Sequence, residues 1–379
     1  MIYILCFTMS SLLFYISRKK NRKVRIIIDC IALFLPCLLA GLRANCVGTD
    51  VSVYLEPMFN LAINTDSFKN FLAGTWYQGW YVRGVADIEI GFSILVFFVA
   101  KVFKNMFVLQ FIIQFLTIVP IYIGLRIRKE ENLWIGMTVY FCMFYNISLN
   151  IMRQLIAISI LFLALQYFLE DKKKLFLLYS FIACSFHNVA ILGFLLPFLY
   201  KFINLKLFKK GNSFKKSKFK LYILTICGLI LVLTQNLIID ILNSLGLSWY
   251  VHYITGEISF LPNQIIIRLP LLFMCLIFRK ELFRKEGDLF FFHCCCIIYA
   301  IIFSQFASVN SYAYRIAMIF SIFLVDFIPK ICSVIPRVHL VNLHEINYNK
   351  LFMLLYLGVW WLYYCVLTID SSMPYVLGI

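Results

Sequence analysis

Two ionisable side chains stand at the ends of very apolar segments of this sequence. Arg153 begins the apolar run that ends at Leu169, and His187 ends the run that begins at Leu175. An arginine or a histidine in such a position is costly unless it reaches a polar partner or a watery cavity. The short charged segment 170–174 between the two runs is predicted to lie on the inner side. Both side chains are therefore predicted to reach one cavity on the outer side of a membrane.

Several more arginines fall on that outer side. When the short basic loops are placed in the cytoplasm, six of the 35 lysines and arginines remain elsewhere: Arg43, Lys69, Arg83, Arg153, Arg268 and Arg315. A guanidinium binds phosphate through two parallel hydrogen bonds and keeps its charge in a low-dielectric site. Arginines at helix ends can also be simple interfacial anchors, and that alternative stays open. The predicted substrate-binding residues are Arg43, Arg153, Gln154, Arg268 and Arg315.

Three residues near the outer helix ends could take part in proton transfer. His187 has the side chain whose pKa is best matched to neutral pH, although a lone histidine in an apolar run is often a core residue. Asp50 follows Gly48-Thr49 and could instead cap a loop. Glu89 could be an ordinary acid at a helix start, favoured by the helix dipole. The predicted catalytic residues are therefore Asp50, Glu89 and His187.

The composition places the chain in a membrane. Its 379 residues are 63% hydrophobic and 14% charged, with a mean hydropathy of +0.88, whereas soluble domains are about half apolar and a quarter charged. Long apolar runs recur from end to end. We expect an all-α, polytopic integral membrane protein with about 12 membrane segments, forming a single transmembrane domain over residues 1–379.

The net charge and the cysteines exclude other classes. A charge of +17 would indicate nucleic acid in a soluble protein, but the basic residues here cluster in short loops, so no nucleic-acid partner is expected. The 13 cysteines lie almost all inside apolar segments and include no C-x-x-C pair. Cysteine in such segments behaves as a small apolar residue. Neither disulfides nor a metal site is predicted, and no cofactor is expected.

The charged loops predict the topology. The basic run 18–25 is placed inside, residues 43–87 form an outer loop without a span, and residues 201–220 form a basic cytoplasmic loop. The segments 88–103 and 106–125 are each followed by cations that look cytoplasmic, which two full crossings cannot produce. Either one of them is partial or a membrane element precedes them, and the sequence leaves this open.

The long apolar piece 175–200 is predicted to be a re-entrant hairpin. As a single span it would carry the lysine-rich loop after it to the outer side, against the positive-inside rule. Two short helices broken around 184–188 avoid this, since each arm of ~12 residues is only ~18 Å long. Non-helical backbone at such a depth persists only where it lines a protein-walled or watery cavity. His187 would then lie at the tip of the turn.

Four aromatic residues in the outer loop form a further pattern. Trp76-Tyr77 and Trp80-Tyr81 suit a belt at the level of the lipid headgroups. They could also form a shelf on which carbohydrate stacks. Both interpretations remain open at this stage.

Together these pieces resemble the EpsG family of bacterial exopolysaccharide proteins, which is related to Wzy-type polysaccharide polymerases. The matching pieces cover residues about 41 to 320 and are, in chain order, Gly41-Leu42-Arg43, Gly48-Thr49-Asp50 with Tyr54, Glu89-Ile90-Gly91-Phe92, Asn150-Ile151-Met152-Arg153-Gln154-Leu155-Ile156-Ala157, Phe186-His187-Asn188 and Tyr314-Arg315. The chain departs from the expected pattern at Cys46-Val47 and in the loop 201–220. Neither departure touches the proposed site.

The resemblance implies a membrane-embedded glycosyltransferase of GT-C-like architecture in the cytoplasmic (inner) membrane of a bacterium. Such enzymes join oligosaccharide repeat units carried on undecaprenyl diphosphate, in exopolysaccharide, capsule or O-antigen biosynthesis. The implied partners are the undecaprenyl-diphosphate-linked glycan and membrane lipid, with other polysaccharide-assembly proteins as candidates. The arginines would stabilise the leaving diphosphate. His187 or Asp50 would be the base, and Glu89 would orient the acceptor sugar.

Two other functions remain open. A lipid-linked oligosaccharide flippase or other transporter would also use arginines around a diphosphate, but it would need inverted repeats or paired broken helices. A membrane O-acyltransferase acting on the glycan would bring a histidine with an acid on a nearby helix.

Overall fold

The computed structural model describes residues 1–129, 132–205, 213–244, 251, 255–256, 258–309, 314–336, 338–339, 345–346, 348–367 and 372–378. They fold as two compact units. The first comprises Met1–Gly193 and Leu357–Ile379, and the second comprises Phe194–Tyr356.

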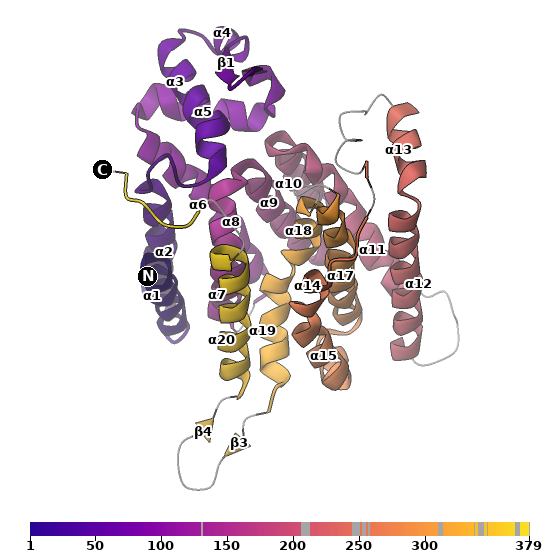
Figure 1. The fold of residues 1–379 in the computed structure, drawn as a ribbon. Helices are drawn as coiled ribbons and strands as arrows, with labels where there is room; N and C mark the ends of the chain where they lie inside the picture. The colour runs from indigo at the N-terminus through magenta and orange to yellow at the C-terminus, as the bar shows by residue number, and fades with distance from the viewer. Residues whose placement is uncertain are drawn as a thin grey trace. The chain divides into compact units, whose positions relative to one another are not determined.

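Unit 1 is mainly helical (Figure 1). Its elements, in chain order, are α1 (Ile2–Ser17), α2 (Arg22–Gly41), η1 (Val51–Leu55), α3 (Glu56–Asn64), α4 (Phe68–Leu72), β1 (Thr75–Gln78), β2 (Tyr81–Gly84), η2 (Val85–Asp87), α5 (Ile90–Phe103), α6 (Met106–Ile127), α7 (Leu133–Tyr140), η3 (Phe141–Tyr145), α8 (Asn146–Asn150), α9 (Met152–Leu169), α10 (Lys173–Phe186) and most of η4 (Asn188–Leu195). The end of α20 (Tyr348–Trp361) and η7 (Leu362–Leu367) complete it.

Unit 2 is also helical in the part that is described, with one small antiparallel strand pair. Its elements are α11 (Leu196–Asn204), α12 (Ser213–Leu233), α13 (Gln235–Ser244), α14 (Pro262–Ile266), α15 (Leu269–Ile277), α16 (Arg279–Glu286), α17 (Asp288–Ser304), η6 (Gln305–Ser308), α18 (Arg315–Ser321), α19 (Leu324–Val334), β3 (Val338–His339) and β4 (Glu345–Ile346), followed by the first part of α20. Of the predicted basic loop 201–220, residues 206–212 lie outside the described residues.

Four of the described helices are long and apolar enough to cross a membrane: α2, α6, α9, and α17 with η6. Two bent pairs, α12 with α13 and α18 with α19, raise this number to six if each pair is one span. The chain is thus an all-α, multi-pass membrane protein. The predicted 12 segments and the GT-C-like architecture are not confirmed.

α2 and α6 run antiparallel and define the two ends of unit 1. At one end, Asp29 of α2 forms an ion pair with Arg126 of α6. At the other end, Gly41 lies so close to Phe107 that a Cβ on the glycine would be 2.8 Å from the ring. The basic runs after α1 and after α6 therefore share one end, as the positive-inside rule requires. We call it the inner end of unit 1.

α5 bears on the topology of residues 88–125, which the sequence leaves open. Its 14 residues extend only ~21 Å at 1.5 Å per residue. Lys101 near its end donates to the Ile63 carbonyl of α3 at 3.0 Å, and α3 belongs to the predicted outer loop 43–87. Both observations favour the alternative in which the segment 88–103 is partial.

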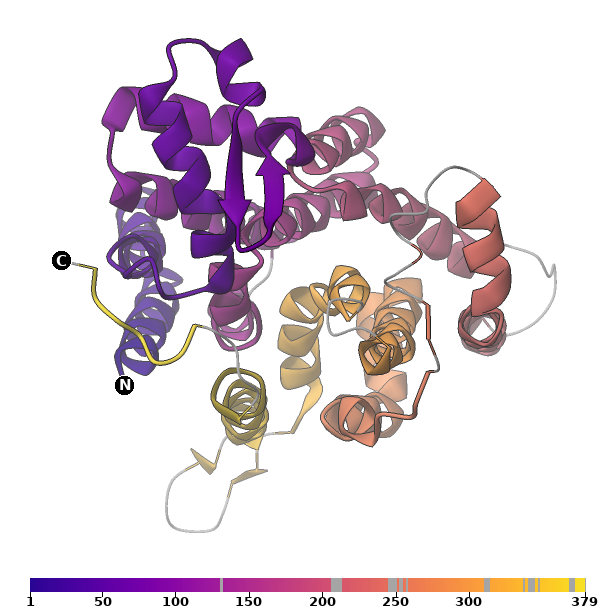
Figure 2. The same ribbon diagram turned by 45° about the horizontal axis from the view of Figure 1, so that its top comes forward.

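The stretch 43–87, which is predicted to be an outer loop, is folded, and one apolar core joins it to α5, α6, α9 and α10. In this core the buried rings of Phe71 and Trp76 lie in the same cluster as Phe92 of α5. Trp76 Nε1 also donates to the Val53 carbonyl at 2.9 Å, which ties the β1–β2 hairpin to η1. Figure 2 shows the hairpin as paired arrows among the helices of this unit. The outer stretch is thereby fixed against the helices that carry Arg153 and His187.

The chain breaks and reverses at His187. α10 ends at Phe186, and His187 is extended, with φ −161° and ψ 130°. The residues after it return along α9, because Gly193 packs against Leu161, about two turns inward of Arg153 along that helix. The predicted break is confirmed, and it places His187 at the end of unit 1 opposite its basic runs.

Candidate active site

The Gly48-Thr49-Asp50 piece docks on the residues that precede α9. Gly48 has a φ of +91°, and a Cβ there would lie 2.3 Å from the Leu149 carbonyl oxygen, so only glycine fits. Next to it, the Thr49 hydroxyl donates to Asn150 Oδ1. These contacts hold the Asp50 backbone at the entrance of α9, beside Arg153.

The second piece places Glu89 between α9 and the tip of α10. Glu89 Oε2 forms an ion pair with Arg153 Nη1, and Glu89 Oε1 accepts a hydrogen bond from the Asn188 backbone N–H at 3.1 Å. Gly91 makes this approach possible, since a Cβ there would lie 2.4 Å from Ser185 Oγ. Both carboxylate oxygens are thus engaged, and the side chain is only 10% exposed. This engagement suits a positioning residue better than a base.

Tyr54 connects Arg153 to Asp50. The Arg153 guanidinium lies over the Tyr54 ring, 4.7 Å from its centroid, a cation–π arrangement. The Tyr54 hydroxyl donates to Asp50 Oδ2 at 2.8 Å. Burial, and then the Asp50 charge, raise the pKa of Tyr54 well above its usual value, so the phenol keeps its proton and continues to donate. Asp50 itself is half-buried.

His187 is half-buried at the break, and its ring nitrogens have different roles. Its Nδ1 accepts a hydrogen bond from the Val189 backbone N–H at 3.1 Å. An imidazole that accepts at Nδ1 carries its proton on Nε2 when it is neutral. In this arrangement Nε2 of His187 is a hydrogen-bond donor, so the neutral ring is suited to donating a hydrogen bond rather than to accepting a proton.

Arg43 is buried, at 3% exposure, and nearly without partners. Its Nη2 contacts Met152 Sδ at 3.3 Å, a weak acceptor. Its Nε and Nη1 have no hydrogen-bond partner in the described part of the chain. Burial lowers the pKa of Arg43 to about 10, so the guanidinium remains charged at neutral pH. Arg43 is thus a buried cation, near Arg153, with N–H groups that have no acceptor. Such a group is what a site for an anion requires.

A segment near the end of the chain pairs with the backbone around Arg43. Residues 372–378 run antiparallel to residues 42–44: Ala44 N donates to the Val376 carbonyl and Gly378 N donates to the Leu42 carbonyl, both at 2.8 Å. The Tyr375 hydroxyl adds a hydrogen bond to the Leu39 carbonyl at 2.9 Å. No local pattern near the end of the chain predicts this pairing.

Four pieces that are far apart in the sequence, those around Arg43 and Asp50, Glu89, Arg153 and His187, thus meet at one end of unit 1. A comparison with protein-family models matches residues 26–377 to the EpsG family. The chain belongs to the EpsG family. No curated protein and no solved structure was found to match it. Membership confirms the resemblance and supports a polymerase-type role in exopolysaccharide assembly.

The remaining predicted residues of this EpsG-family chain have other surroundings. Gln154 is buried in α9 next to Arg153, at 2% exposure. In unit 2, Arg268 is 4% exposed, and its Nη1 donates to the Gln264 carbonyl at 2.8 Å and to Gln264 Oε1 at 3.1 Å. Arg315 is half-buried at the start of α18. Both unit 2 arginines therefore lie where α15 and α18 begin, as the sequence predicts.

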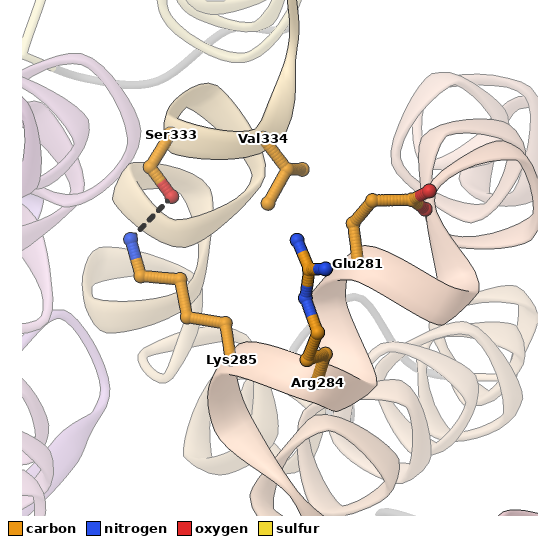
Figure 3. Close-up of a pocket in the computed structure, with 5 residues that line it drawn as sticks. All are labelled: Glu281, Arg284, Lys285, Ser333 and Val334. Atoms are coloured by element: carbon orange, nitrogen blue, oxygen red, sulfur yellow. Dashed lines mark hydrogen bonds between the residues drawn. The ribbon is translucent and has the colours of Figure 1, made fainter.

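A hollow with a volume of about 480 Å³ lies in unit 2. It is lined by Glu281, Arg284 and Lys285 of α16 and by Ser333 and Val334 of α19. Figure 3 shows the Arg284 guanidinium pointing between the two helices. Lys285 Nζ donates to Ser333 Oγ at 2.7 Å. This hollow holds charges of both signs and none of the predicted site residues, so the EpsG-family function is not assigned to it.

Proposed function

We propose that this chain polymerises oligosaccharide repeat units carried on undecaprenyl diphosphate, at the outer face of a bacterial cytoplasmic membrane. The observation that carries the proposal is the convergence of Asp50, Glu89, Arg153 and His187, from four distant segments, beside the buried and nearly unpartnered Arg43. Family membership supports the polymerase role.

In the proposed reaction, a hydroxyl of one lipid-linked repeat unit attacks the anomeric carbon of the sugar on another. The new C–O bond forms as the bond between the anomeric carbon and the diphosphate oxygen breaks, and the diphosphate leaves with that electron pair. Its charge is the main one to be stabilised, and fixed cations in a site of low dielectric do this without reorganisation. Arg43, through Nε and Nη1, and the open edge of Arg153 are assigned to it.

The attacking hydroxyl loses its proton, and we assign Asp50 as the base. Glu89 has both oxygens engaged, and the neutral His187 ring has its acceptor nitrogen occupied by the Val189 N–H. Asp50 is a half-buried carboxylate that accepts a hydrogen bond from the Tyr54 hydroxyl, and an ionised carboxylate can take a proton. His187 then donates through Nε2, and Glu89 holds Arg153 in place.

The acceptor glycan is assigned to the aromatic hairpin of the outer stretch. Of its four aromatic residues, Trp76 is buried in the core at 9% exposure, whereas Tyr77, Trp80 and Tyr81 are 81%, 99% and 76% exposed. Large exposed rings offer flat apolar contact area with polar edges, which suits the faces of sugar rings. The structure thus separates one structural aromatic from three that are available to a ligand.

The experiment is deletion of the gene in its host, with analysis of the lipid-linked glycans. A polymerase mutant accumulates single repeat units on the lipid carrier and makes no long polymer. Complementation by the wild-type gene, but not by an Arg153→Lys variant present at equal level, links the defect to this site. Full-length polymer in the deletion strain would refute the proposal.

One observation favours the O-acyltransferase alternative, because unit 2 contains a histidine with an acid on a nearby helix. His293 Nε2 of α17 lies 3.5 Å from Asp326 Oδ2 of α19. Both side chains are at most 2% exposed, and neither lines the hollow between α16 and α19. The pair therefore suits a buried tie between two helices. Glycan acetylation that disappears in a His293→Gln variant, with polymer length unchanged, would reverse this assignment.

A further inference from the structure

The second hollow lies at the inner end of unit 1, and basic residues from separate segments surround it. Its volume is about 370 Å³, and its walls include Arg18, Arg25, Arg126, Lys129 and Trp134. Arg18 follows α1, Arg25 is in the first turns of α2, Arg126 is in the last turn of α6 and Lys129 follows it. Four like charges around one hollow repel each other unless an anion balances them.

Acidic residues of the protein neutralise little of this positive charge. Asp29 is buried at 1% exposure and is occupied, because it pairs with Arg126 and accepts from the Tyr122 hydroxyl at 2.7 Å. Residues 18–29 and 126–131 contain nine basic residues against three acidic ones. This count includes Glu130 and Glu131, which lie outside the described residues. A positive excess therefore remains at the hollow.

Two of the residues in its walls have orphan donors. Arg25 Nε and Trp134 Nε1 are buried and have no hydrogen-bond partner in the part of the chain that is described. Buried donors are normally satisfied by protein, water or ligand. An oxygen-rich anion would satisfy donors of both kinds and would also offset the charge. Phosphate is the anion whose oxygens best match a guanidinium.

The surroundings indicate where that phosphate comes from. Exposed apolar side chains stand next to the basic residues, with Ile16 at 40% on α1 and Ile26 and Ile27 at 50% and 61% on α2. Basic pockets between helices on the cytoplasmic side are a common way of binding anionic headgroups. We infer that this hollow binds the phosphate of an anionic phospholipid of the inner leaflet, whose acyl chains lie along α1 and α2.

The test uses the full-length chain purified in detergent. The protein is titrated with phosphatidylglycerol or with phosphatidylcholine of matched acyl chains. Native mass spectrometry measures lipid binding, and thermal unfolding measures the stability of the protein with each lipid. Wild type is expected to retain phosphatidylglycerol preferentially and to unfold at a higher temperature with it. The double variant Arg18→Gln/Arg25→Gln should bind phosphatidylglycerol with an affinity at least ~10-fold lower than that of wild type. The control Lys19→Gln/Lys20→Gln removes the same charge from exposed residues outside the hollow and should change affinity no more than about threefold.

A third variant, Trp134→Phe, keeps an aromatic ring at this position but removes the indole N–H donor. It should weaken phosphatidylglycerol binding a few-fold without changing net charge. If the double variant fails to fold without lipid, this third variant still tests whether the hollow binds phosphatidylglycerol. The inference is overturned if both lipids bind equally, or if the two double variants lose equal affinity. It is also overturned if millimolar inorganic phosphate displaces phosphatidylglycerol, because the hollow would then be a site for soluble phosphate.

Discussion

The Glu89 carboxylate holds Arg153 from one side while its second oxygen caps the backbone at Asn188. The ion pair therefore does more than neutralise a charge at the end of α9. It joins the start of α5, the start of α9 and the break after α10, three segments that no local sequence pattern connects. The Arg153 guanidinium is fixed on the Tyr54 ring, and its remaining edge is oriented before any substrate arrives, which is the condition for electrostatic preorganisation.

The first prediction concerns this pair. Glu89→Gln should unfold more easily than wild type, because an amide N–H would face the guanidinium. The loss should reach up to ~3 kcal/mol, less than for a fully buried pair because the Arg153 side chain is 21% exposed. Arg153→Lys should keep the fold but lose most polymer formation, since a point charge replaces the planar fork.

A double-mutant cycle checks the first prediction. Glu89→Gln combined with Arg153→Met should be less destabilised than the sum of the two single variants, by ~0.5–3 kcal/mol. The measurement is thermal unfolding of purified protein in one detergent, together with polymer formation in cells at equal protein level. If the loss of unfolding free energy in the double variant equals the sum of the losses in the two single variants, the two side chains do not interact.

The second prediction follows from the burial of Arg43. Replacing it with methionine removes a buried cation with orphan donors, so Arg43→Met should unfold at a higher temperature than wild type while losing polymerase activity. The gain should be at least ~1 kcal/mol at neutral pH. A stabilised but inactive variant is the combination expected of a binding residue. An interfacial anchor would give a less stable variant that remains active.

The difference in stability between Arg43→Met and wild type should depend on pH in a definite direction. Burial lowers the pKa of Arg43 to about 10 in the folded chain, well below its ordinary value in the unfolded chain. The folded state thus binds fewer protons between these values, and the penalty for burying the charge fades as the pH rises through 10. The stability advantage of Arg43→Met over wild type should be full at pH 7–9 and should shrink above pH 10. An advantage that grows with pH would contradict this assignment.

The extent to which the sequence predicts this site differs between its parts. The break at His187 was predictable, because a single span over residues 175–200 would carry the lysine-rich loop after it to the outer side. The partners of Glu89 were not, because they depend on Gly91 allowing α5 to touch Ser185, a contact between segments almost a hundred residues apart. Lys101 could not be placed from the charge pattern, because its acceptor, the Ile63 carbonyl, carries no charge that a loop pattern could register. The segment 372–378 pairs through its backbone, which leaves no trace in side-chain composition.

The third prediction separates the two candidate bases. Asp50→Asn should reduce turnover by roughly 10²–10⁴ with little change in KM, because the amide cannot take the proton. His187→Gln should have a smaller effect, on the order of tenfold, because the glutamine amide can replace the Nε2–H donor. Tyr54→Phe serves as the control, since it removes the donor to Asp50 but not the carboxylate. The assay uses membrane preparations with lipid-linked repeat units. A His187→Gln variant slower than Asp50→Asn would exchange the two roles.

The last prediction concerns the aromatic hairpin. Trp80 lies at the turn, is 99% exposed and contributes nothing to the core, so Trp80→Ala should leave the unfolding temperature unchanged. If the hairpin holds the acceptor glycan, losing one stacked ring worth about 1 kcal/mol should raise the acceptor KM about fivefold and shorten the polymer, with kcat nearly unaltered. The matched variant is Trp76→Ala in the same hairpin. That ring is buried and hydrogen-bonded to the Val53 carbonyl, so its removal should cost ~3 kcal/mol of stability. If Trp80 is instead a headgroup anchor, Trp80→Ala will leave KM and polymer length unchanged, and Trp80→Phe will behave identically.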